Sequence, residues 1–234
     1  MTAAIKLNDI KIEVERKNIK NVHLSVYPPN GRVRVAAPAH MNMNTIRIFA
    51  ISKLGWIRKQ QKRLRSQERE SPREYVDRES HYVWGRRYLL KVIERESAPE
   101  VILGHRTLYL YVRPNTDTDK RRAIIDRWYR DQVREHAAPL IKKFERKLGV
   151  TSENLFVQHM KTRWGGCNHL SRNIRLNTEL AKKPPECLEY IVLHELAHIR
   201  EPRHSSAFIK LLDRLMPSWM HQRELLNSLP IVTV

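Results

Sequence analysis

Cysteine, glycine and aromatic residues are scarce in this chain of 234 residues, which has two cysteines, seven glycines and 7% aromatics. Cys167 and Cys187 can form one disulfide at most, so a disulfide-rich extracellular scaffold is excluded. Runs of apolar residues are all much shorter than the roughly 20 residues that cross a bilayer. The first residues also lack the basic start and apolar stretch of a secretory signal. We therefore expect a reducing, cytoplasmic setting and no membrane partner.

Acidic residues are few relative to basic ones. The chain has 44 Lys and Arg against 25 Asp and Glu, a formal net charge of +19. Residues 1–113 carry 23 basic and 11 acidic side chains, and residues 114–234 carry 21 and 14, so no basic tail accounts for the surplus. The positive electrostatic field of such a chain attracts phosphate polyanions. We expect a nucleic acid or nucleotide partner; the alternative is a surface whose charge only aids solubility.

The first 113 residues alternate apolar and polar positions in short stretches, a pattern typical of half-buried strands. Pro28-Pro29-Asn30-Gly31 marks a turn between two of these stretches. Strands are expected at 5–15, 20–27, 81–84, 87–94 and 107–113, and one helix at about 45–69. Pro114-Asn115-Thr116-Asp117 then breaks the pattern. The sequence therefore predicts a β-rich N-terminal domain over 1–113 and a second domain over 114–234.

The second domain reads as mostly helical. A helical pattern covers 118–148, and Pro139 is expected to kink or split it because proline lacks the backbone donor. Strands are predicted at 154–160 and 173–177, and a helix begins after Pro184-Pro185. The expected fold class is α+β, in which the β-rich N-terminal region packs with a helical core.

The helix after Pro185 carries the strongest chemical signal. His194 and His198 are four residues apart, so both imidazoles lie on one face of the helix and can bind one ion. Glu195 projects about 100° further round the helix, where a carboxylate can hydrogen-bond the reacting water. Apolar neighbours predict that this His-Glu-x-x-His helix is buried. The alternative is that both histidines are core residues bonded to backbone carbonyls.

A third ligand is available just beyond the helix. Glu201-Pro202 should end the helix, because the residue before proline avoids the α region. His204 then follows on a chain that has turned back, ahead of a second amphipathic helix. A catalytic Zn²⁺ takes three protein ligands and keeps an open position. We therefore predict Zn²⁺ bound by His194, His198 and His204, with Glu195 as the catalytic base.

One segment and three further residues are interpreted as parts of the structure around this site. The run 160–167 (Met-Lys-Thr-Arg-Trp-Gly-Gly-Cys) is expected to form a loop beside the cleft, where its glycines permit close backbone approach. Cys167 is interpreted as a structural thiol in preference to a ligand. His159 is interpreted as structural in preference to a group that stabilises an oxyanion. Trp219 is expected in the core.

These motifs resemble a known family. The run 160–167, Ile-Arg-Leu-Asn at 174–177, the segment 190–198 and His-Ser-Ser-Ala-Phe at 204–208 are similar to the YgjP-like, SprT-related zinc metallopeptidases. The resemblance implies a compact, zincin-type α+β core, zinc on the three histidines and Glu195 as general base. Gly166 departs from the serine usual in the family. Metzincins also place a histidine ten residues after the first, but Glu201 replaces the glycine that their turn requires.

Three functions compete for this sequence. The leading hypothesis is a zinc metallopeptidase that hydrolyses proteins or peptides, and the resemblance together with the charge suggests nucleic-acid-associated proteins as substrates. The second is a metal-dependent hydrolase of nucleotide polyphosphates, because the same Lewis acid can cleave a phosphoanhydride. The third is a basic nucleic-acid-binding module with a structural metal. Closed structural sites usually take four protein ligands, which disfavours the third hypothesis.

Overall fold

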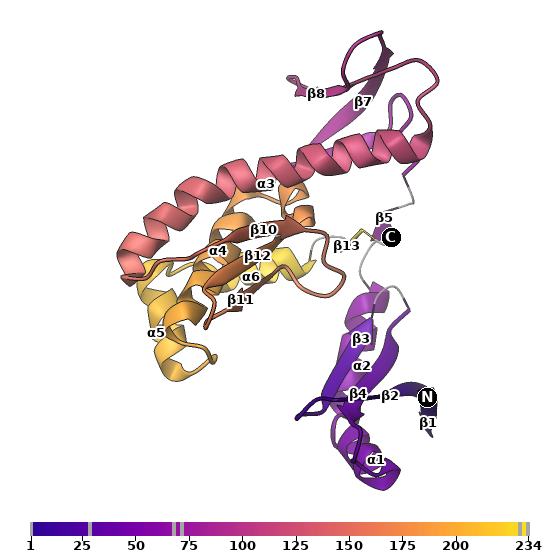
Figure 1. Ribbon diagram of the computed structural model, residues 1–234, viewed down its shortest axis with the longest axis vertical. Helices are drawn as coiled ribbons and strands as arrows, with labels where there is room; N and C mark the ends of the chain where they lie inside the picture. The colour runs from indigo at the N-terminus through magenta and orange to yellow at the C-terminus, as the bar shows by residue number, and fades with distance from the viewer. Residues whose placement is uncertain (1, 28–29, 67–68, 71–72, 229–230, 233–234) are drawn as a thin grey trace. The chain divides into compact units, whose positions relative to one another are not determined.

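The computed structural model describes the chain except for residues 1, 28–29, 67–68, 71–72, 229–230 and 233–234 (Figure 1). The chain divides into two compact units. Unit 1 comprises Met1–Ser71 and Pro230–Val234, and unit 2 comprises Pro72–Leu229. Among the described residues, no helix is both long and apolar enough to span a bilayer.

Unit 1 is built on a four-stranded sheet in the order β1-β2-β4-β3. Its strands are β1 (Thr2–Leu7), β2 (Ile10–Lys17), β3 (His23–Tyr27) and β4 (Arg32–Pro38). The single strand expected over 5–15 is wrong, because Asn8 adopts a left-handed conformation with φ of 54° and the chain turns there. β1 and β2 then pair antiparallel, with Ile5 opposite Ile12.

Two helices cover the apolar residues of this sheet. The helix expected over 45–69 is divided into α1 (Met43–Ser52) and α2 (Leu54–Ser66), which separate at Lys53. Asn42 caps α1 by accepting a 2.8 Å hydrogen bond from the amide of Thr45. The two helices and the sheet enclose a core of their own, formed by Ile5, Leu7, Ile10, Ile12, Val14, Val33, Val35, Ala37, Ile46, Ala50 and Ile57. A short parallel pair, β5 (Arg69–Glu70) with β13 (Ile231–Val232), also belongs to unit 1.

Unit 2 begins with a second four-stranded sheet in the order β6-β7-β9-β8. Its strands are β6 (Ser80–Val83), β7 (Arg86–Glu94), β8 (Glu100–Leu103) and β9 (Thr107–Val112). This sheet shares one core with the helices that follow, since Leu90 and Leu110 are buried in the same cluster as Ile125. The hydroxyl of Tyr129 also donates a 2.9 Å hydrogen bond to the carbonyl of Tyr82.

The shared core corrects the expected domain boundary. The division falls at residues 71–72 and not at 113–114, because the sheet of β6–β9 is built into unit 2. The Pro114–Asp117 segment is a tight connection between β9 and the next helix. Asn115 has φ of 60°, and the amide of Thr116 donates to the carbonyl of Arg113. The β-rich region predicted as one domain is therefore shared by the two units.

Helix α3 (Thr118–Leu148) runs through unit 2 without interruption. In Figure 1 it lies between the β6–β9 sheet and the helices that follow in the chain. The expected split at Pro139 is wrong. Buried side chains on both sides of Pro139, such as Ala137 and Ile141, pack into the core and outweigh one lost backbone hydrogen bond. Asp117 caps the start of α3, and Gly149 ends it with φ of 66°.

The remainder of unit 2 holds the predicted chemistry. A three-stranded sheet in the order β10-β12-β11 is followed by a 3₁₀ helix and three α-helices. These elements are β10 (Leu155–Gln158), β11 (Gly165–Asn168), β12 (Asn173–Asn177), η1 (Thr178–Lys182), α4 (Pro185–Arg200), α5 (Ser206–Leu215) and α6 (Trp219–Ser228). The expected α+β class is confirmed as a mixed fold of several sheets and, among the described residues, six α-helices.

Candidate metal centre

Helix α4 positions two of the three predicted ligands. Pro185 occupies its first turn, where a missing amide costs nothing, and Leu188, Val192 and Leu196 bury one side of the helix. His194 and His198 lie one turn apart, and their ring centroids are separated by 4.9 Å. The helix ends at Glu201, whose amide donates to the carbonyl of Ala197.

The turn after α4 brings the third histidine to the first two. His204 precedes α5, whose N-cap is the Ser205 hydroxyl, which accepts a hydrogen bond from Phe208. The ring centroid of His204 lies 5.0 Å from that of His194 and 4.7 Å from that of His198. One ligand nitrogen from each ring lies within 4.8 Å of the other two. Among the described residues, this is the one group of three or more His, Cys, Asp or Glu side chains close enough to hold a metal ion.

The ring nitrogens fit a divalent metal. Nδ1 of His198 donates to the carbonyl of Glu201 at 3.1 Å, which leaves Nε2 with a lone pair for an ion. Nε2 of His194 and Nε2 of His204 are 3.1 Å apart. Two nitrogens on one tetrahedral Zn²⁺ are separated by about 3.3 Å, given Zn–N bonds of about 2.0–2.1 Å. The donor set and its spacing could therefore hold a divalent metal ion.

Burial keeps two of these imidazoles in the form that binds metals. Desolvation, together with the neighbouring charges of His198, His204 and Arg223, lowers the pKa of His194 to about 3. Desolvation also lowers the pKa of His198, although its bond to the Glu201 carbonyl acts in the opposite direction. A metal binds the neutral imidazole, so these rings need not lose a proton first at neutral pH.

Glu195 is a buried carboxyl beside the histidines, with 6% of its surface exposed. Burial raises its pKa to about 8, and the positive charge of Arg163 opposes that rise. A carboxyl whose pKa lies near neutrality can accept and return a proton during a reaction at physiological pH. A metal ion next to it would favour the ionised form.

Strand β11 lies directly against Glu195. A Cβ atom built on Gly165 would come within 2.6 Å of Oε1 of Glu195 and 2.9 Å of Cγ2 of Ile191. Residue 165 must therefore lack a side chain for this close approach. At Gly166 no atom lies within 4 Å of a built Cβ, so the serine usual in the resembling family would fit there.

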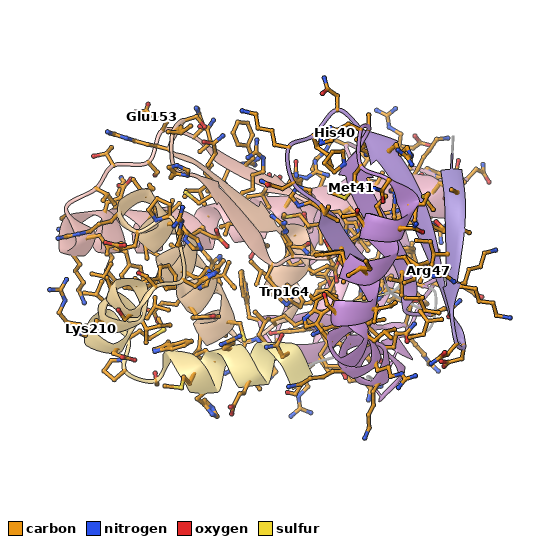
Figure 2. The ribbon with its side chains drawn as sticks, turned by 90° about the horizontal axis from the view of Figure 1, so that it is seen from below. His40, Met41, Arg47, Glu153, Trp164 and Lys210 are labelled. Carbon is orange, nitrogen blue, oxygen red and sulfur yellow. The ribbon has the colours of Figure 1, made fainter. Side chains whose placement is uncertain are left out.

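Asn177 holds the segment that leads into β11. Its amide nitrogen donates to the carbonyls of Met160 and Arg163, both at 2.8 Å. Its side-chain oxygen accepts from the amides of Met160 and Glu179, and its backbone amide donates to Trp164, a residue labelled in Figure 2. The expected loop over 160–167 is thus correct for its first half only, since 165–168 form β11.

Phe208 and Tyr190 line the histidines with aromatic surface. The buried ring of Phe208 lies 5.0, 4.7 and 4.9 Å from the rings of His194, His198 and His204. Tyr190 lies 5.7 Å from His194 and stacks on Trp219, which is buried as expected. The sequence did not predict that Phe208 contacts the histidines or that Asn177 holds the segment before β11. The available signals were an aromatic residue four positions after His204 and an asparagine at the end of a strand.

His159 and Cys167 stand outside the histidine cluster. Nδ1 of His159 lies 4.0 Å from Oε1 of Glu179, in a separate polar group. Burial, aided by the charge of Glu195, raises the pKa of the Cys167 thiol to about 11, so this thiol remains protonated at neutral pH. Both observations agree with the structural reading of these two residues.

The three histidines therefore form a candidate metal centre at the end of a helix with the pattern His-Glu-x-x-His. The model of the family "YgjP-like, metallopeptidase domain" matches residues 20–229, and the chain belongs to this family. The resemblance found in the motifs is confirmed.

Relatives of known name match smaller parts of the chain. The UTP pyrophosphatase of Escherichia coli (strain K12) is 32% identical over 97 residues, which are 41% of this chain and 58% of that protein. The chain therefore matches little more than half the length of this curated relative. Two solved structures also match, the metallopeptidase zymogens jannalysin of Methanocaldococcus jannaschii and abylysin of Pyrococcus abyssi. Jannalysin is 21% identical and abylysin 22% identical to this chain, and both have a TM-score of 0.34. Each match covers 38% of this chain, together with 90% of the jannalysin chain and 87% of the abylysin chain.

Proposed function

We propose that this chain is a zinc-dependent metallopeptidase in which His194, His198 and His204 bind the ion and Glu195 is the general base. The observation that carries the proposal is the convergence of three ring nitrogens within 4.8 Å beside a buried carboxyl. Membership of a metallopeptidase family supports the same reaction class. We also propose that the natural substrates are proteins or peptides in the cytoplasm, including proteins associated with nucleic acid.

The residues of the site divide the chemistry between them. Zinc, when bound, would act as a Lewis acid that polarises the scissile carbonyl and acidifies the attacking water. Glu195 accepts the proton of that water and delivers it to the leaving amine. Gly165 lets β11 approach Glu195 closely, and Asn177 holds the segment that leads into β11. The aromatic surface of Phe208 excludes water from one side of the histidines.

The test is Glu195→Gln, which keeps the size of the side chain and removes its basicity. We expect the purified variant to retain about one zinc per chain by elemental analysis and to lose about 10²–10⁴-fold in peptide turnover. A variant with normal turnover and normal zinc content would disprove the assigned role of Glu195. Loss of zinc together with turnover would show that Glu195 acts in metal binding.

A second function is favoured by one specific observation, the similarity to a UTP pyrophosphatase. In this alternative the same site cleaves a phosphoanhydride of a nucleoside triphosphate, and the net charge of +19 supports an anionic substrate. The zinc-loaded protein should be offered a peptide library and UTP side by side, with Glu195→Gln as the blank. Release of pyrophosphate without peptide cleavage would favour the second function over the first.

The third hypothesis, a nucleic-acid-binding module with a structural metal, has less support. Within the described residues the cluster supplies three ligands, whereas a closed structural site needs four. Binding of nucleic acid by a protein that turns over neither the peptides nor UTP would support this third hypothesis.

A further inference from the structure

Unit 1 contains a long segment without acidic residues. Between Glu15 and Glu68 the sequence has 12 Lys and Arg residues and no Asp or Glu. The overall composition, 25 acidic residues in 234, would place about five or six in a segment of this length. Both helices of unit 1 lie inside this segment. The positive surplus of the chain is therefore concentrated here.

Part of this charge is neutralised on the strands. Arg34 pairs with Glu15, and Lys17 lies 3.2 Å from the same carboxylate. Arg32 lies 3.7 Å from Glu13 on the neighbouring strand. These two glutamates offset part of the charge of the paired strands β2 and β4, which carry five basic residues and a net charge of +3.

The helices, in contrast, present several exposed cations. Arg47 on α1, Lys53 between the helices, and Lys59 and Lys62 on α2 are all exposed (Arg47 is labelled in Figure 2). No acidic side chain among the described residues lies within ion-pair distance of these four. Arg58 differs from them, since it lies 3.7 Å from Asp9. The helices and Lys53 carry seven basic residues and no acidic one, so they hold more unbalanced charge than the paired strands β2 and β4.

The same helices expose large apolar side chains. Ile48 and Ile51 are 68% and 50% exposed on α1, and Trp56 is 44% exposed on α2. Trp56, Lys59 and Lys62 follow one another at intervals of three residues, so neighbours in this series lie on adjacent turns of one side of α2. The core of unit 1 uses Ile57 from α2 instead. An exposed indole beside two exposed cations needs an explanation other than packing.

We propose that the exposed side of α1 and α2 binds single-stranded nucleic acid, with Lys59 and Lys62 contacting phosphates and Trp56 stacking on an unpaired base. Base–aromatic stacking beside a basic track is the general mode of single-strand binding. A duplex is less suitable, because its bases are accessible only at their edges in the grooves. This inference does not depend on the proposed hydrolase activity.

An anionic membrane is the competing partner for a basic surface with exposed apolar residues. Binding to a bilayer scales with the apolar area that can enter it. On α2, Ile57 and Leu64 are buried and Leu54 is partly buried, so the exposed large apolar side chains described on the two helices are Ile48, Ile51 and Trp56. Seven basic residues on the same two helices and at Lys53 outnumber these three, which favours a phosphate polymer.

The first experiment measures binding of the full chain to a fluorescent 20-mer of thymidylate by anisotropy over a range of salt concentrations. Lys59→Gln/Lys62→Gln should weaken binding and reduce the slope of log K against log salt by about 1.4, since each phosphate contact on a single strand contributes about 0.7. The matched control, Lys142→Gln/Lys210→Gln, removes two exposed charges from unit 2 (Lys210 is labelled in Figure 2). The control should keep the parent slope. Equal effects of the two double variants would overturn the proposal, because binding would then follow net charge alone.

The second experiment separates stacking from apolar insertion. Trp56→Phe keeps an aromatic face, and Trp56→Leu keeps only apolar bulk. Loss of stacking in Trp56→Leu should weaken binding about 5-fold to about 150-fold, while Trp56→Phe stays within about threefold of the parent. Circular dichroism of each variant checks that unit 1 remains folded.

Two competitors decide the partner. An unlabelled duplex of equal length should compete poorly for the protein. Vesicles of phosphatidylglycerol should sediment the parent protein no better than the Trp56→Leu variant. Single-stranded nucleic acid would be rejected as the ligand of this surface if the duplex competed equally well, or if the vesicles bound the parent, Trp56→Leu and Trp56→Phe proteins equally well.

Discussion

Gly165 and Glu195 are in direct contact: a methyl group at residue 165 would come within 2.6 Å of Oε1 of the glutamate and 2.8 Å of its Cγ. Gly165→Ala should therefore push the carboxyl away from its position. A displacement of about 1 Å can lower turnover about 100-fold. We expect turnover to fall by about that factor while zinc content stays unchanged, measured by peptide hydrolysis and elemental analysis.

Gly166→Ala is the matched control for this variant, because no atom lies within 4 Å of its added Cβ. It should retain the turnover of the parent protein. If both variants lose activity equally, contact with Glu195 is not the reason for the glycine at 165.

Removal of metal should destabilise the folded protein. A ligand that binds only the native state adds about 2.7 kcal/mol at a free concentration of 100 times its Kd. A chelator should lower the melting temperature of the parent protein and leave that of His204→Ala almost unchanged, since this variant lacks one of three ligands. His221→Ala, an exposed histidine outside the cluster, should respond to the chelator as the parent does.

Asn177→Ala should loosen the segment before β11. The side chain makes two hydrogen bonds of 2.8 Å to backbone carbonyls and accepts two more from backbone amides. At roughly 1 kcal/mol each, their loss should lower the free energy of unfolding by about 2–4 kcal/mol. Turnover should fall with zinc content intact, and limited proteolysis should cut near residues 160–164.

Asn173→Ala provides the comparison, because Asn173 makes one exposed contact, accepting a 3.0 Å hydrogen bond from Asn154. It lies at the other end of the same strand, β12. This variant should lose less than about 1 kcal/mol of unfolding free energy. A similar loss in both variants would argue against a special role for Asn177.

His81 should make stability depend on pH. Burial lowers its pKa to about 3 from 6.5, and the charges of Arg73 and Lys182 add to the effect. The unfolded chain takes up a proton below about pH 6.5 and the folded chain does not until about pH 3, so stability falls as the pH decreases through this window. Between pH 7 and pH 5 the loss attributable to His81 should be about 2 kcal/mol.

The measurement compares urea unfolding of the parent protein and His81→Asn, both without metal, at pH 7 and pH 5. His194 titrates in the same direction, but it is present in both proteins and cancels in the difference. The difference in unfolding free energy should shift by about 2 kcal/mol in favour of the variant at pH 5. A pH-independent difference would show that His81 is not kept neutral by the fold.

The histidine arrangement could be predicted because it depends on local geometry. A spacing of four residues places His194 and His198 on one side of a helix, and Pro202 forces the chain to turn before His204. Glu195 follows from the same periodicity. Their use in catalysis stays a prediction. Alternation likewise predicts β7 and β9, whose pairing buries Leu90 and Leu110.

Features that depend on distant partners could not be predicted. The sequence Gly-Gly-Cys-Asn has little strand propensity, and β11 exists because Gly166 and Cys167 pair with β12. Pro139 is a residue that commonly kinks or splits a helix, but burial of Ala137 and Ile141 keeps α3 continuous. The domain boundary was misplaced because a turn at Asn115 resembles a linker when the packing of the adjacent sheet is unknown.

The pairing of β5 with β13 has a topological consequence. Strand β13, near the C-terminus, belongs to unit 1, so unit 2 is an insertion within unit 1 and the polypeptide passes between the units twice. A single proteolytic nick near residue 71 would place the two strands of this ribbon, β5 and β13, on different fragments. Expression of residues 1–71 alone would omit a strand that the intact chain supplies from its far end.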